Sequence, residues 1–110
     1  MRQVKMYVPR EVGEVLDQLG YMMLAAPKFL DKTGYFPYRN LDYVCRQLTV
    51  GLTNIRSTIG EDRYNDLTRM AAEMRALFEA DPENTTGETL QGRKLILQME
   101  DILREARRKA

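Results

Sequence analysis

The side chains that most often perform catalysis are nearly missing from this chain. It has no histidine, which is the commonest general base and metal ligand, and its single cysteine, Cys45, cannot build a zinc site. Ser57 is the only serine, and no histidine is present to activate it as a nucleophile. Glycine-rich phosphate loops, a GxSxG turn and a Walker sequence are also absent. We therefore expect no catalytic residue, no metal and no cofactor.

Carboxylates offer the one remaining route to chemistry. Glu11, Glu14 and Asp17 recur every three residues, and Asp62 with Asp66 recurs at four. Such spacing can hold magnesium in a helical nucleotide hydrolase, but it is also what a solvated helix face shows. Ordinary i,i+4 ion pairs are expected at Glu100–Arg104 and Glu105–Lys109. The solvated face is the preferred interpretation, and we predict that the protein is not an enzyme.

The richest local feature is the stretch PKFLDKTGYFPYR, from Pro27 to Arg39. Its thirteen residues hold two of the four prolines, two of the three phenylalanines and two of the six tyrosines. Clustered rings are costly in water, so they either pack onto the protein or contact a partner. In the first interpretation the end of a helical bundle is filled by Phe29, Leu30, Tyr35 and Phe36. In the second, the loop binds another protein, with candidate contact residues Asp31, Lys32, Tyr35, Phe36, Tyr38 and Arg39.

Four amphipathic helices must position this loop. Apolar residues at helical spacing predict helices over about 9–26, 40–59, 61–80 and 87–108. Asn40 is the expected N-cap of the second helix and Gly60 its stop, while Thr85 with Glu88 suggests a capping box for the fourth. Val4, Met6 and Val8 alternate with polar neighbours, which indicates a short extended or strand-like segment before Pro9. The prediction is an all-α single domain over residues 1–110, a four-helix bundle.

The predicted core lies on one face of each helix. In the first two helices the core positions are Val12, Val15, Leu16, Leu19, Met22, Met23, Leu41, Val44, Cys45, Leu48, Leu52, Ile55 and Ile59. In the last two they are Tyr64, Leu67, Ala71, Met74, Leu77, Phe78, Leu95, Ile96, Met99, Ile102, Leu103 and Ala106. Gly13 and Gly20 interrupt the first helix, where either a close helix crossing or simple irregularity would account for them.

Charge and length restrict the partners and the compartment. A chain of 110 residues can bury a core without metals or disulfides, and its net charge of +1 gives no global field for nucleic acid or an anionic membrane. The lone cysteine is compatible with a reducing cytoplasm, and no signal peptide is recognisable. The longest uninterrupted apolar run, Tyr21 to Ala26, is too short to span a bilayer. We expect a cytoplasmic protein without membrane or nucleic-acid partners; the sequence does not specify its oligomeric state.

The amino-terminal segment VKMYVPREVGEVLDQL, Val4 to Leu19, resembles the opening of ribbon-helix-helix DNA-binding proteins. In that family a short strand pairs with its copy in a dimer and its outward side chains enter the major groove. The resemblance implies that Gln3, Lys5 and Tyr7 would face DNA. The chain departs from the family pattern, because Pro27 to Arg39 replaces the short turn between the family's two helices. A dimeric transcriptional regulator using residues 3–8 is our alternative hypothesis.

A longer part of the chain resembles the small helical immunity proteins found beside bacterial polymorphic toxins. The resemblance is carried by PKFLDKTGYFPYRNLDYV, IGEDRYNDL and FEADPENTTGETLQGRKLILQMEDIL, over most of residues 27 to 103. It implies a non-enzymatic protein that occludes a toxin through a stable interface. Aromatic and arginine side chains of the loop would then anchor the complex, since such residues usually carry most binding energy. Unlike many nuclease inhibitors, this chain is not acidic overall.

Overall fold

The chain is helical throughout most of its length. The structure, a computed structural model, describes residues 7–29 and 40–109, and these form helices and connecting segments without any strand. The helices are α1 (Val12–Ala25), α2 (Leu41–Asn54), α3 (Arg56–Ile59), α4 (Glu61–Ala80) and α5 (Glu88–Lys109). The predicted all-α class is therefore confirmed for the described part of the chain. Residues 1–6, 30–39 and 110 are outside the described part, and they include most of the predicted extended segment.

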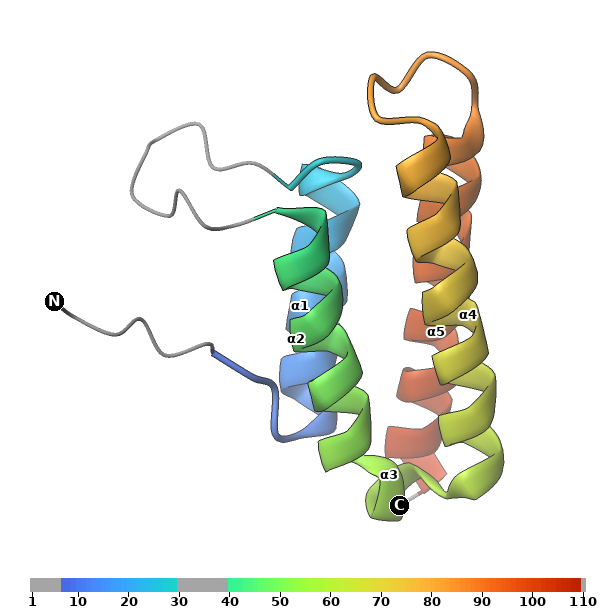
Figure 1. Cartoon of the computed structure of the whole chain (residues 1–110). Helices are drawn as coiled ribbons and strands as arrows, with labels where there is room; N and C mark the ends of the chain where they lie inside the picture. The colour runs from blue at the N-terminus through green and yellow to red at the C-terminus, as the bar shows by residue number, and fades with distance from the viewer. Residues whose placement is uncertain (1–6, 30–39, 110) are drawn as a thin grey trace, which may run out of the picture.

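The long helices pack as two neighbouring antiparallel pairs. Figure 1 shows α1 beside α2 and α4 beside α5, with the end of α1, the start of α2 and the 81–87 connection at the same end of the molecule. The pairs meet through contacts of α2 with α4 and of α1 with α5, and the short α3 crosses the opposite end, against α4 and α5. Each long helix thus buries its apolar face against the others.

A single apolar cluster fills the space between the helices. Most predicted core positions are buried, including Val15, Leu48, Leu67 and Leu103, each at most 1% exposed. Leu16, Met23, Leu41, Tyr64, Ala71, Leu95 and Ile102 are partly buried against the cluster. The sequence interpretation missed Met70, which is 7% exposed. Leu77 was predicted as a core position but is not part of the cluster, so in α4 the helical spacing predicted most of the core and not all of it.

The first helix starts later than predicted. Glu11 is extended, with φ −132° and ψ 161°, so Pro9 does not open the helix. Instead the Pro9 carbonyl accepts a hydrogen bond of 2.8 Å from the Asn54 side chain, and the Pro9 ring packs over Gly51. A Cβ at residue 51 would lie only 3.0 Å from that ring. The extended residues before α1 therefore lie along α2, a tertiary contact that overrides the preference of proline for a first helical turn.

The predicted second helix is divided in two. Residue Ile55, with φ −101° and ψ 4°, separates α2 from α3, although its N–H still donates to the Gly51 carbonyl. Both Ile55 and Ile59 remain buried, at 1% and 2% exposure, so the division preserves the predicted apolar face. The third predicted helix, 61–80, is confirmed as α4, and the fourth is confirmed to within one residue at each end.

The cap of α5 differs from the prediction. The Asp81 carboxylate accepts hydrogen bonds from the N–H groups of Thr85, Thr86 and Thr89, at 2.7, 3.1 and 3.0 Å. Glu88 is bonded by the Thr86 hydroxyl, so the predicted Thr85–Glu88 capping box is wrong. A carboxylate seven residues before the helix satisfies the donors that a local box would have taken.

Candidate functional site

The candidate functional site is the aromatic loop predicted from Pro27 to Arg39, and the structure describes how the chain on either side of it is held. All six predicted partner-binding residues, Asp31, Lys32, Tyr35, Phe36, Tyr38 and Arg39, lie outside the described residues. The structure describes the residues on either side of them, which end at Phe29 and resume at Asn40. Both sides show how the loop is attached to the helices.

Phe29 is the anchor at the start of the loop. Its side chain is completely buried, and its ring lies edge-on to Phe78 with centroids 5.6 Å apart and tilted against Tyr21 at 6.3 Å. The interpretation that loop aromatics fill the end of the core is therefore confirmed for Phe29. Leu30, Tyr35 and Phe36, predicted together with it, lie outside the described residues.

Arg93 of α5 holds the carbonyl end of α1. Its guanidinium donates to the carbonyls of Met23 at 3.2 Å and Ala26 at 3.3 Å. The last carbonyls of a helix have no partner within the helix, so a cation placed there satisfies them and complements the negative end of the dipole. Next along the chain, the Lys28 ammonium pairs with Glu83 of the α4–α5 connection at 2.7 Å. The start of the loop is thus held from two directions.

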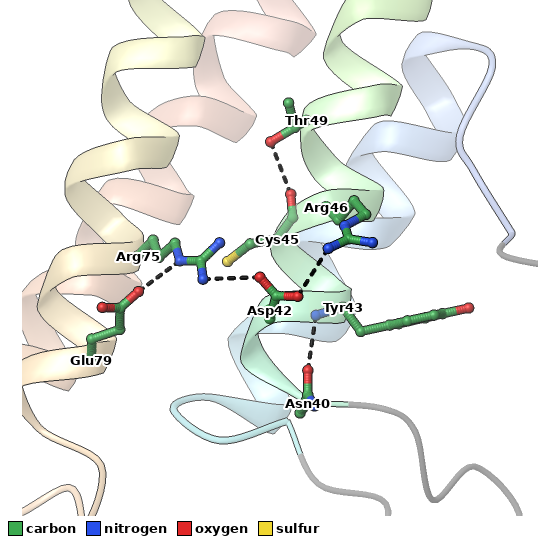
Figure 2. Close-up of polar contacts among 8 residues, drawn as sticks. All are labelled: Asn40, Asp42, Tyr43, Cys45, Arg46, Thr49, Arg75 and Glu79. Atoms are coloured by element: carbon green, nitrogen blue, oxygen red, sulfur yellow. Dashed lines mark hydrogen bonds and ion pairs between the residues drawn. The ribbon is translucent and has the colours of Figure 1, made fainter.

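The end of the loop is fixed by a helix cap and an ion-pair network. The Asn40 side chain accepts a 2.9 Å bond from the Tyr43 N–H, which confirms the predicted N-cap. Asp42 then bridges two arginines, Arg46 on its own helix at 3.2 Å and Arg75 of α4 at 3.0 Å, as Figure 2 shows. Because the Asp42–Arg75 pair joins α2 to α4, the end of the loop is tied to the second helical pair.

Sequence reasoning missed a surface beside the start of the loop. A hollow of about 440 Å³ is lined by residues 24–29 together with Pro82, Glu83 and Asn84. Leu24 at its edge is 87% exposed, the highest value among the large hydrophobic side chains of the described residues. The sequence signal was present, because the apolar run Tyr21 to Ala26 is longer than one helix face can bury. Only the fold shows which of its residues stays outside.

Two of the five carboxylates considered for magnesium, Glu14 and Asp66, are engaged in other contacts. Glu14 accepts the Tyr7 hydroxyl at 2.7 Å and the Arg10 N–H at 3.1 Å, and these two bonds lower the pKa of its carboxyl. Asp66 pairs with Arg69 at 3.4 Å. In the described ranges no group of three or more histidine, cysteine, aspartate or glutamate side chains is arranged to hold a metal ion.

The two ion pairs predicted near the end of the chain can be compared with the structure. The Glu105–Lys109 pair is confirmed at 3.2 Å, whereas Arg104 pairs with Asp101 at 3.8 Å in place of the predicted Glu100. Glu100 is instead 8% exposed and lies on the side of α5 that is packed inward.

Of the residues that the ribbon-helix-helix resemblance places on DNA, Gln3 and Lys5 are outside the described part. Tyr7 is 55% exposed with its hydroxyl on the Glu14 carboxylate.

Comparison with known proteins identifies no protein that is significantly similar to this chain: no protein family model matches it, and no curated protein or solved structure does. Among the described helices, none is both long enough and apolar enough to cross a lipid bilayer.

Proposed function

We propose that this chain is a non-enzymatic protein-binding protein, and most concretely an immunity protein that binds and neutralises a cognate bacterial toxin in the cytoplasm. The observation that supports this best is the attachment of the aromatic loop. Phe29 is buried in the core at one end and Asn40 caps α2 at the other, so the sequence between them begins and ends on a rigid scaffold. Binding residues are commonly placed on loops held in this way.

The scaffold we propose is a four-helix bundle made of α1, α2, α4 and α5. The packing of α1 on α5 and of α2 on α4 supports this description, with α3 as a short closing turn. A bundle of this kind presents its connections at its ends, and the end of α1, the start of α2 and the 81–87 connection share one end (Figure 1). That end is the proposed binding end.

The proposed contacts are Asp31, Lys32, Tyr35, Phe36, Tyr38 and Arg39, and we add Leu24, which is exposed near the end of α1. Apolar, aromatic and arginine side chains together have the composition of an interface centre. The DNA-binding alternative receives less support, because the Tyr7 hydroxyl donates to the Glu14 carboxylate, so this side chain would bring a negative charge toward the polyanionic DNA.

The test is recovery of a partner by pull-down from the native host, followed by affinity measurements on variants. We expect Tyr38→Ala and Arg39→Ala to weaken the complex at least about tenfold, as truncation of interface anchors does. Leu24→Ala should weaken it as well. Arg104→Ala on the side of α5, 55% exposed at the side chain, is the matched control and should bind like the parent. Parent-like affinity of both loop variants would place the interface elsewhere.

A further inference from the structure

A small hollow, open to solvent past the exposed residues Thr49, Thr68 and Ala72, lies between α2 and α4, away from the proposed binding end. Its volume is about 200 Å³. We call it the α2–α4 basin, and its lining residues are Cys45, Leu48, Thr49, Leu52, Thr68, Ala71, Ala72, Met74 and Arg75. Buried core side chains form the floor, whereas small side chains form the walls. Small walls between two otherwise packed helices leave room for a guest molecule.

Contacts between the two helices close the basin at both ends. At one end Arg75 of α4 reaches Asp42 of α2 at 3.0 Å, as Figure 2 shows. At the other end the hydroxyls of Thr53 and Tyr64 lie 3.4 Å apart, again joining α2 to α4. Asp42 and Thr53 are about 16 Å apart along the helix at 1.5 Å per residue. A helix or strand lying in this space would have to break one of the bridges, so the basin suits a compact occupant.

The lining carries no unmatched charge. The Arg75 guanidinium is neutralised by Asp42 and by Glu79, the latter at 2.6 Å. The Thr49 hydroxyl already donates to the Cys45 carbonyl at 3.0 Å. An ionic guest would therefore exchange hydration for no new partner, which is unfavourable.

Cys45 is the buried polar group of the lining that remains open to a guest, whereas the Thr68 hydroxyl, also without a partner among the described residues, belongs to an exposed residue. Cys45 is 6% exposed, and its thiol has no hydrogen-bond partner among the described residues. Figure 2 shows its sulfur on the α4 side of α2, near Arg75. Burial raises the pKa of this thiol to about 11, so it is neutral at pH 7. A thiol is a weak donor and acceptor that packs well against apolar and aromatic groups.

We propose that the α2–α4 basin binds one small, neutral, mainly apolar molecule, of the size of a single or fused aromatic ring, against the Cys45 thiol. An apolar cavity of about 150 Å³ accommodates benzene, so the volume of the basin matches this class of ligand. This site is separate from the loop and does not depend on the proposed toxin interface.

Indole is a suitable probe because it combines the required size with neutrality. In a titration followed by ¹H–¹⁵N shifts, we expect saturable changes centred on the lining residues. Cys45 is the only cysteine, so alkylation by iodoacetamide, which is slow at a buried neutral thiol, is assigned to Cys45 alone. At an indole concentration ten times Kd, the unoccupied fraction falls to about one eleventh, and alkylation should slow about tenfold.

A matched pair of variants decides where indole binds. Ala72→Leu adds side-chain volume at the basin, whereas Ala76→Leu makes the same change one turn further along α4, outside the lining. Both positions are exposed, so both variants should fold. We expect Ala72→Leu to lose the shifts and the protection of Cys45, and Ala76→Leu to keep them.

Three results would overturn the proposal. One is equal indole binding by Ala72→Leu and the parent. Another is a saturable response centred on residues outside the lining. The third is protection of Cys45 by a purified protein partner but not by indole, which would make the basin part of a protein interface.

Discussion

At the scale of single residues, glycines show how strongly a position depends on its neighbours. Gly92 lies against the ring of Phe78, and a Cβ at residue 92 would stand 2.4 Å from a ring carbon. Around Gly20 a Cβ would meet nothing within 4 Å. A close helix crossing therefore does not explain Gly20, whereas Gly92 is required by packing.

These two glycines give opposite predictions for the same substitution. Gly92→Ala should lower the free energy of unfolding by about 1 kcal/mol or more, because overpacking costs about 1–3 kcal/mol. Gly20→Ala should raise it by about 0.5–1 kcal/mol, since alanine is the better helix former. Urea denaturation of both variants provides the measurement. A stabilised Gly92→Ala variant would show that the Phe78 ring can move aside.

The Asp81 carboxylate should make the stability of the folded protein depend on pH. Burial alone would raise its pKa, but the N–H donors of Thr89, Thr85 and Thr86, with the Thr89 side chain, outweigh it and hold the pKa well below the ordinary 3.8. A lowered pKa in the folded state means that the folded protein binds fewer protons than the unfolded chain. The contribution to stability is then fully present above about pH 4 and is lost as the pH falls toward the folded-state pKa.

Removing the Asp81 charge should therefore show how much of the loss of stability in acid comes from this one carboxylate. We expect Asp81→Asn to have a lower melting temperature than the parent at pH 7, with a difference that narrows as the pH falls below 4. Asp101→Asn, with a side chain 82% exposed, is the control and should follow the parent curve. A difference in melting temperature between Asp81→Asn and the parent that stays constant from pH 7 to pH 2 would contradict this account.

At the scale of elements, the attachment of the loop rests on one aromatic side chain. Phe29→Ala should destabilise the protein by about 3–5 kcal/mol, as expected for a fully buried phenylalanine. Leu24→Ala, five residues earlier and 87% exposed, should change the free energy of unfolding by no more than about 0.5 kcal/mol. Thermal and urea unfolding of both variants test this contrast. Equal stability of the two would mean that Phe29 is not part of the core.

The elements themselves were largely predictable from the sequence. The ends of α4 and the Asn40 cap follow from residues within a few positions of each end, so local patterns were sufficient. No local sequence pattern predicted the division of the helix at Ile55. The neighbouring Asn54 contacts Pro9, which is forty-five residues away in the sequence, so the division lies beside a tertiary contact. The anchors of the candidate site, Arg93 and Glu83, were likewise unpredictable, since their partners come from α1 and the residues after it.

At the scale of the whole molecule, one apolar cluster is shared by all five helices. We therefore expect a single cooperative unfolding transition, with the same midpoint by far-UV circular dichroism and by tyrosine fluorescence. Because Cys45 is unpaired and the described residues hold no group of side chains arranged to bind a metal ion, EDTA and reductants should leave the midpoint unchanged. Loss of helix on adding EDTA would falsify this prediction, as would separate transitions for the α1–α2 and α4–α5 pairs.

The sequence by itself determined the helical class, the four apolar faces and the sites of the main turns. These depend on helical periodicity and on glycine, proline and capping residues, which act over a few positions of the chain. Tertiary structure alone decided that the residues before α1 lie on α2 and that Phe29 is buried. It also decided that Glu100 faces inward while Arg104 pairs with Asp101, and that small residues of α2 and α4 enclose a basin. Each of these depends on which distant segments become neighbours, and burial and charge pairing are set by those neighbours rather than by local spacing.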